Sequence, residues 1–84
     1  MEDLVKLYTL STCSHCKALK QFLKEKGISY EYTDVDLLDG EERAKVLEEV
    51  RNINPNCSFP TTVIGKNVVV GNRQEEIKKL LQIE

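Results

Sequence analysis

Residues 4–27 read LVKLYTLSTCSHCKALKQFLKEKG, and this stretch decides the fold. Its first part, residues 4–9, is rich in β-forming side chains and is bounded by polar residues, so it predicts a strand. After a polar segment, apolar side chains recur at helical spacing, namely Cys16, Leu19, Phe22 and Leu23. Gly27 follows at the position where helices commonly end. The stretch therefore predicts a strand, a short loop and an amphipathic helix, with two cysteines where loop and helix meet.

The rest of the chain predicts a β-α-β-α-β-β-α order within a single domain spanning residues 1–84, since 84 residues are too few for two cores. Strands are expected over residues 29–36, 61–64 and 68–70. A second helix is expected from Asp39-Gly40 to about Asn52, and a last one around Ile77, Leu80 and Leu81. The first β-α-β unit implies two parallel strands joined by a right-handed crossover, and the Gly65-Lys66-Asn67 connection predicts a hairpin.

Composition excludes two classes of partner. The net charge is −2, and lysines and arginines alternate with acids, so there is no basic stripe to neutralise phosphates and no nucleic acid is expected. The longest apolar runs are a few residues, against the ~20 that a membrane span needs. The acidic start, Met1-Glu2-Asp3, lacks the layout of a secretory signal, so a cytoplasmic location is expected and no membrane association.

The three cysteines do not form a disulfide framework, which needs an even and denser set. Cys13 and Cys16 make a C-x-x-C pair, and Cys57 stands alone. In a reducing compartment this usage indicates redox chemistry or metal binding.

The position of Cys13 at the start of a helix has a chemical consequence. The free N–H groups and the positive end of the helix dipole favour a thiolate, so the pKa of Cys13 is expected to be low. Cys16 lies one turn further in and is expected to stay a thiol until it is needed. Cys13 would then attack a client disulfide and Cys16 would resolve the mixed disulfide, with His15 and Lys17 adding positive charge nearby.

Two other interpretations of the pair stay open. A zinc site would have to use the unusual set Cys13, His15, Cys16 and Cys57, so no metal site is expected. The pair could also be two inert core cysteines. Its position between a strand and a helix, inside a β-α-β unit, favours redox chemistry over both.

Three segments together resemble the glutaredoxins. They are Tyr8-Thr9 leading into Cys13-Ser14-His15-Cys16, Phe59-Pro60-Thr61 before a strand, and Val70-Gly71 before the last helix. The chain is similar above all to the glutaredoxin-like small redoxins of bacteria and archaea, over about residues 4–82. This resemblance implies an α/β, thioredoxin-like fold of the glutaredoxin type: a four-stranded mixed sheet flanked by three helices.

The resemblance also assigns roles to individual residues. It implies that the peptide bond before Pro60 is cis, that Pro60 packs against the active-site disulfide, and that Phe59 pairs with substrate backbone. Residues expected to tune activity are His15, Lys17 and Pro60. Residues expected to contact substrate are Thr12, Ser14, Phe59, Gly71, Asn72 and Arg73. Three of these assignments have a plainer alternative, since His15 and Arg73 could be solvated side chains and Pro60 could be an ordinary trans proline that opens a strand.

Departures from the glutathione-using pattern bear on the reductant. Leu10 stands where glutaredoxins often have a lysine, His15 where they often have a tyrosine, and Asn72-Arg73 where they tend to have an acid. The expected function is thus a monomeric dithiol carrier that reduces client proteins and is recharged by a thioredoxin-type or ferredoxin-dependent reductase. It would need no cofactor besides its disulfide.

Two alternatives to this function remain. One is a glutathione-dependent glutaredoxin. The other is an iron–sulfur cluster module using Cys13, because Ser14 replaces the usual proline. Cys57 would trap mixed disulfides, join a regulatory bridge, or be a small loop residue without redox duty.

Overall fold

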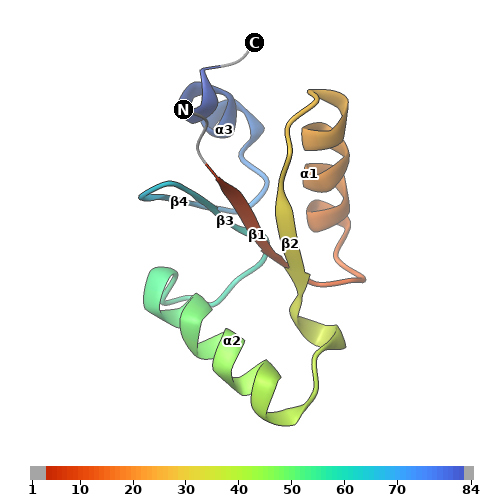
Figure 1. Cartoon of the computed structure of the whole chain (residues 1–84), viewed down its shortest axis with the longest axis vertical. Helices are drawn as coiled ribbons and strands as arrows, with labels where there is room; N and C mark the ends of the chain where they lie inside the picture. The colour runs from red at the N-terminus through yellow and green to blue at the C-terminus, as the bar shows by residue number, and fades with distance from the viewer. Residues whose placement is uncertain (1–3, 83–84) are drawn as a thin grey trace.

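The computed structural model describes residues 4–82, in which four strands form one sheet with helices packed around it (Figure 1). In chain order the elements are β1 (Val5–Thr9), α1 (Ser14–Glu25), β2 (Glu31–Asp34), the 3-10 helix η1 (Val35–Leu37), α2 (Gly40–Ile53), β3 (Thr61–Ile64), β4 (Asn67–Val70) and α3 (Gln74–Leu81). This confirms the predicted β-α-β-α-β-β-α order. None of the helices within residues 4–82 is long and apolar enough to cross a membrane.

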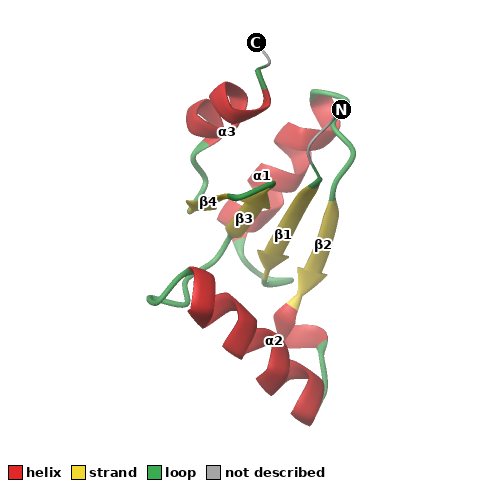
Figure 2. Ribbon diagram, turned by 60° about the vertical axis from the view of Figure 1, so that its left-hand side comes forward, coloured by secondary structure: helices red, strands yellow, loops and turns green. Residues whose placement is uncertain are grey.

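The sheet has the order β2-β1-β3-β4, with β1 in the interior. β1 runs parallel to β2 and antiparallel to β3, and β3 and β4 form the predicted hairpin. The parallel pair follows from the α1 crossover, which returns the chain to the end of the sheet where β1 began. The predicted mixed sheet is thus confirmed (Figure 2).

The core lies between one face of the sheet and the helices α1 and α3. Its buried members are Val5, Leu7, Leu19, Phe22, Leu23, Ile64, Val69 and Ile77. β1 contributes alternate residues to this face, as a pleated strand must, and α1 contributes its apolar stripe. α2 lies beside η1 and buries only Val50 fully. α1 and α3 therefore contribute to the core, whereas α2 contributes little to it.

The second strand is shorter than predicted. Alternation over residues 29–36 suggested one strand, whereas β2 ends at Asp34 and a 3-10 turn follows, closed by a bond from the Leu38 amide to the Val35 carbonyl at 3.2 Å. β2 is an edge strand whose only neighbour is the five-residue β1, so it can be no longer than that partner allows. The prediction was wrong because the length of an edge strand depends on its neighbour.

Gly27 ends α1 as predicted. Its φ of +70° is a left-handed conformation that suits glycine, and the turn is closed by two backbone bonds. The Gly27 amide donates to the Lys24 carbonyl at 3.1 Å and the Ile28 amide to the Leu23 carbonyl at 3.0 Å. The turn sends the chain back toward β2.

Candidate active site

Cys13 caps the N-terminus of α1. It precedes Ser14, its backbone is extended (φ −81°, ψ 119°), and its sulfur accepts a hydrogen bond from the Cys16 amide at 3.3 Å. A side-chain acceptor at this position satisfies one of the free N–H groups of the first turn. The first turn contains no acidic residue, so the positive end of the helix dipole acts on the Cys13 sulfur without a competing charge there.

The pKa of Cys13 is set by two opposing effects. Partial burial raises the pKa, but hydrogen bonds from the Cys16 thiol, the Cys16 amide and the His15 amide together outweigh burial and lower it below its usual value. The direction agrees with the sequence prediction. A lower pKa increases the thiolate fraction of Cys13 at any given pH.

Cys16 is fully buried on the inner face of α1. Burial first, and then its hydrogen bond to Cys13, raises the pKa of Cys16 to about 12, while the Leu10 backbone and the Lys20 ammonium act in the opposite direction. The pKa values of the two thiols of one motif are thus shifted in opposite directions. Cys13 can attack as a thiolate, and Cys16 keeps its proton.

The Pro60 loop lies at the same end of the sheet as the cysteines. Tyr8 pairs with Thr61, so Pro60 flanks the end of β1 from which the chain continues into the Cys13 loop. The Phe59-Pro60 bond is cis, as the resemblance implies, and Pro60 is buried. The Gly71 amide donates to the Pro60 carbonyl at 2.8 Å, which places the start of the last connection beside it.

Asn54 organises the Pro60 loop from within. Its side chain is 3% exposed, and its amide nitrogen donates to the Thr61 hydroxyl at 3.0 Å and to the Ser58 carbonyl at 3.2 Å. The Thr61 hydroxyl in turn donates to the Ser58 carbonyl at 2.7 Å. One buried amide therefore joins the end of α2, the loop and the first residue of β3.

Asp36 holds the loop on the other side of Cys13. Its carboxylate accepts a hydrogen bond from the Ser11 amide at 2.8 Å and a second from the Ser11 hydroxyl. The Ser11 hydroxyl and amide, aided by the charge of Arg43, hold the pKa of Asp36 below its usual value. A charged Asp36 thus ties the chain just before Cys13 to η1.

The other predicted site residues differ in their exposure. Thr12, Ser14, His15 and Lys17 are exposed around Cys13, and Phe59 is half-buried. His15 acts on Cys13 through its amide, so the predicted effect of its imidazole stays a prediction. Cys57 is a free thiol with a φ of +49°, in a turn closed by a bond from its amide to the Asn54 carbonyl at 2.8 Å.

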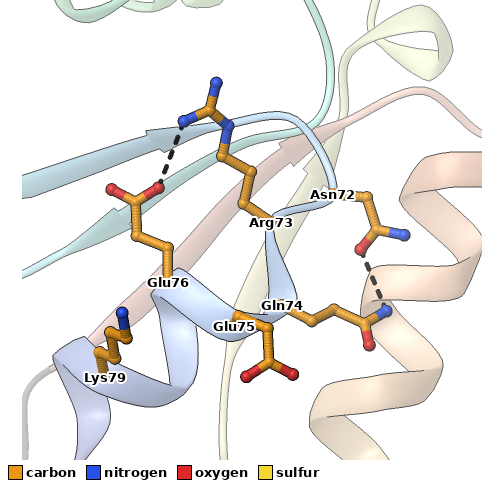
Figure 3. Close-up of a pocket in the computed structure, with 6 residues that line it drawn as sticks. All are labelled: Asn72, Arg73, Gln74, Glu75, Glu76 and Lys79. Atoms are coloured by element: carbon orange, nitrogen blue, oxygen red, sulfur yellow. Dashed lines mark hydrogen bonds and ion pairs between the residues drawn. The ribbon is translucent and has the colours of Figure 1, made fainter.

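An open hollow lies at the start of α3 (Figure 3). Its lining residues are Asn72, Arg73, Gln74, Glu75, Glu76 and Lys79, so neither cysteine of the pair lines it. The Arg73 guanidinium is exposed and lies 3.5 Å from the Glu76 carboxylate, and the Asn72 side chain accepts a hydrogen bond from Gln74 at 3.1 Å. Arg73 is thus paired with a residue of the first turn of α3.

Within residues 4–82, no three His, Cys, Asp or Glu side chains gather in a way that could hold a metal ion.

The sequence analysis missed the residues that hold the two loops. Asn54 lies between the predicted second helix and the strand predicted over residues 61–64, and Asp36 lies in a segment predicted to be a strand. The Asn-Pro pair at Asn54 signals a turn, but nothing local indicates that the amide reaches Thr61. Asp36 gave no signal, because its partner Ser11 is 25 residues away.

Comparisons with known proteins agree with this geometry. The glutaredoxin family pattern matches residues 5–69. A glutaredoxin-like 8.6 kDa protein encoded in the rubredoxin operon of Clostridium pasteurianum is 34% identical over 79 residues, which cover 94% of this chain and 99% of that protein.

Two solved structures from archaea are similar in fold and sequence. Methanoredoxin from Methanosarcina acetivorans has a TM-score of 0.91 and 37% identity, covering 95% of this chain and 85% of its own. The glutaredoxin grx-1 from Archaeoglobus fulgidus has a TM-score of 0.89 and 42% identity, covering 95% of this chain and 87% of its own. With its thioredoxin-like sheet, its capped cysteine and its cis-proline loop, this chain belongs to the glutaredoxin family.

Proposed function

We propose that the protein is a dithiol carrier that reduces disulfides of client proteins. The Cys13 thiolate attacks one sulfur of the client disulfide, and the other client sulfur leaves as a thiolate. Cys16 then attacks Cys13 in the mixed disulfide, so the client departs fully reduced and a Cys13–Cys16 disulfide remains. Two electrons pass to the client, and the two cysteines need no further cofactor.

The observation that supports this proposal best is the different placement of the two thiols: Cys13 caps α1 and is half-buried, whereas Cys16 is fully buried on the inner face of the helix. A thiol of lowered pKa near the surface and a buried thiol of raised pKa suit a two-step exchange, in which the second thiol acts only after the first has bound. Two inert core cysteines would not need one member at a helix cap, half-exposed.

We propose that a thioredoxin-type or ferredoxin-dependent reductase returns two electrons and two protons to the disulfide. Leu10, His15 and Arg73 support this choice over glutathione, because they replace residue types that glutathione-using glutaredoxins often have. The Arg73 side chain is also exposed and paired with Glu76, next to where an acid would meet the glutathione amine. A positive charge there repels an amine.

The test compares two ways of reducing the oxidised protein. One uses glutathione with its NADPH-linked reductase, the other a thioredoxin reductase with NADPH, and both are followed by NADPH consumption. We expect fast turnover with the thioredoxin reductase and slow turnover with glutathione. Faster reduction by glutathione would make the protein a glutathione-dependent glutaredoxin, and a Cys13→Ser variant reduced as fast as the parent would contradict both.

Anaerobic reconstitution with iron and sulfide tests the remaining alternative. A dithiol carrier is expected to stay colourless. A visible absorption band that is lost in Cys13→Ser would instead support a cluster-binding module.

A further inference from the structure

A half-buried ion pair lies on the α1 side of the sheet, at the end where the cysteines are. The Lys20 ammonium is 2.9 Å from a carboxylate oxygen of Asp34, and the two side chains are 20% and 14% exposed. Taking two charges out of water costs about as much as their attraction returns, so such a pair adds little net stability. The pair is therefore better explained by the electrostatic effect of the Lys20 charge on neighbouring groups than by its contribution to stability.

The position of the ammonium is fixed from several sides. Asp34 is the last residue of β2 and pairs with Thr9, whose buried hydroxyl donates to the same carboxylate oxygen. The ring of Tyr32 lies 4.1 Å from the Lys20 nitrogen. β1 and β2 thus hold the lysine in place across the sheet.

Lys20 follows Cys16 by four residues on α1. Side chains four apart are neighbours on one helix face, and both of these turn toward the sheet, since Cys16 is fully buried and Lys20 reaches Asp34. The Lys20 charge acts on the Cys16 thiol in the direction that favours its thiolate. The charge of Cys13 acts in the opposite direction.

The balance between these two charges changes during the reaction. Once Cys13 has formed a mixed disulfide, its negative charge and its hydrogen bond with the Cys16 thiol are lost. Of the two charged groups that act on Cys16 among residues 4–82, Lys20 remains. Cys16 therefore becomes easier to ionise at the step in which it must react.

We propose that Lys20, anchored by Asp34, is a positioning residue for the resolving step, in which its ammonium stabilises the Cys16 thiolate. This inference rests on the dithiol function proposed above. In the step, a bond forms between the two cysteine sulfurs, and the bond between Cys13 and the client sulfur breaks. The client sulfur leaves with that electron pair and takes up a proton in place of the one that Cys16 loses.

The two steps can be separated by stopped-flow absorbance in a Cys57→Ser background. The reduced protein is mixed with an excess of an aromatic disulfide that releases coloured nitrothiobenzoate. A first release, proportional to reagent concentration, reports attack by Cys13. A second release, independent of that concentration at low excess, reports resolution by Cys16. Absence of the second release in the parent would contradict the proposed function itself.

Lys20→Gln is compared with Lys24→Gln, which removes the same charge from an exposed position one turn further along α1. If the pKa of Cys16 rises by about one unit, the thiolate fraction falls about tenfold. A thiolate of higher pKa is also the stronger nucleophile, which recovers about a factor of three. Resolution by Cys16 should therefore be about threefold slower. The first release should be unchanged, Lys24→Gln should match the parent, and the deficit of Lys20→Gln should shrink as pH rises.

Lys20→Arg tests whether the charge is responsible, because it keeps the cation and should stay within about twofold of the parent. The proposal is overturned if Lys20→Gln resolves as fast as Lys24→Gln, or if Lys20→Arg is as slow as Lys20→Gln. If the glutamine variant does not fold, Lys20→Met replaces it, because its unbranched apolar side chain suits a position over the Tyr32 ring.

Discussion

Two cysteines three residues apart have opposite chemistry because their surroundings differ. Cys13 lies outside the first turn of α1 and receives hydrogen bonds from N–H groups, whereas Cys16 lies inside the helix and faces the core. The first environment lowers the pKa of a thiol and the second raises it. The division of labour in the pair is thus set by position along one helix.

Alkylation at varied pH measures this difference. In Cys57→Ser protein, the rate of Cys13 modification by iodoacetamide should reach half its maximum below pH ~8.5, the usual value for cysteine. Peptide mass mapping should find Cys16 unmodified in the folded protein, because it is buried and its pKa is raised to about 12. A midpoint at or above the usual value, or modification of Cys16 before Cys13, would contradict the conclusion that the cap position lowers the pKa of Cys13.

Asn54→Ala should destabilise the protein. It removes the hydrogen bonds that the Asn54 amide donates to the Thr61 hydroxyl and the Ser58 carbonyl, which together contribute about 1–3 kcal/mol to the free energy of unfolding; only the bond from the Thr61 hydroxyl to Ser58 is kept. Urea unfolding measures the loss. Asn56→Ala is the matched control, since Asn56 is exposed in the same loop and takes part there through its backbone amide. Equal effects of the two variants would argue against the Asn54 network.

Replacing glycine by alanine should change stability in opposite directions at the C-terminal end of α1 and at the N-terminal end of α2. Gly27→Ala places a side chain at a φ of +70°, and since no atom would lie within 4 Å of the new Cβ, the cost is that of the backbone alone, about 1–2 kcal/mol. Gly40→Ala, in the first turn of α2, meets no clash either and should stabilise by about 0.4–1 kcal/mol. Thermal unfolding of both variants checks the signs, and two equal shifts would contradict the assigned helix ends.

The link between η1 and the Cys13 loop depends on the charge of Asp36. Hydrogen bonds from Ser11 keep the pKa of Asp36 in the folded protein below its unfolded value. Their contribution is therefore present above the unfolded pKa of about 3.9 and is lost as pH falls through the lower folded value. NMR should show the Ser11 amide shifting with that low midpoint.

Asp36→Asn should abolish the titration of the Ser11 amide and lower the melting temperature near neutral pH. Asp39→Asn should do neither, because Asp39 is exposed and its side chain makes no capping bond to α2. If the Ser11 amide titrated with the usual midpoint of an aspartate, the hydrogen bonds between Ser11 and the Asp36 carboxylate would not lower the pKa as described.

Burial is distributed unevenly over the molecule, and local stability should follow it. Four side chains of α1 are buried against the sheet, whereas α2 has one buried side chain and lies at the end of the sheet (Figure 1). Segments with few buried contacts open first. Hydrogen exchange should therefore be faster in α2 than in α1, and the reverse order would show that α2 is held by contacts other than its buried face.

The sequence allowed the order of elements and the cysteine pair to be predicted because both rest on local patterns. Apolar spacing marks α1, and a glycine marks its end. The contacts that hold the site together join distant segments: Lys20 to Asp34 over 14 residues and Thr9 to Asp34 over 25. They depend on the register between β1 and β2 and on where β2 ends, which the periodicity of residues 29–36 placed two residues too far.

Because a cysteine caps α1, the stability of the folded chain is coupled to the reduction potential of its disulfide. A sulfur in a disulfide has no negative charge to offer the helix, so the stabilisation by the cap belongs to the reduced, folded chain. In a cycle through folded, unfolded, reduced and oxidised states, the same free energy must reappear as a higher reduction potential, about 30 mV for each 1.4 kcal/mol. A substitution that strengthens the cap would thus make the disulfide a stronger oxidant, which shifts electron exchange with any partner toward reduction of this chain.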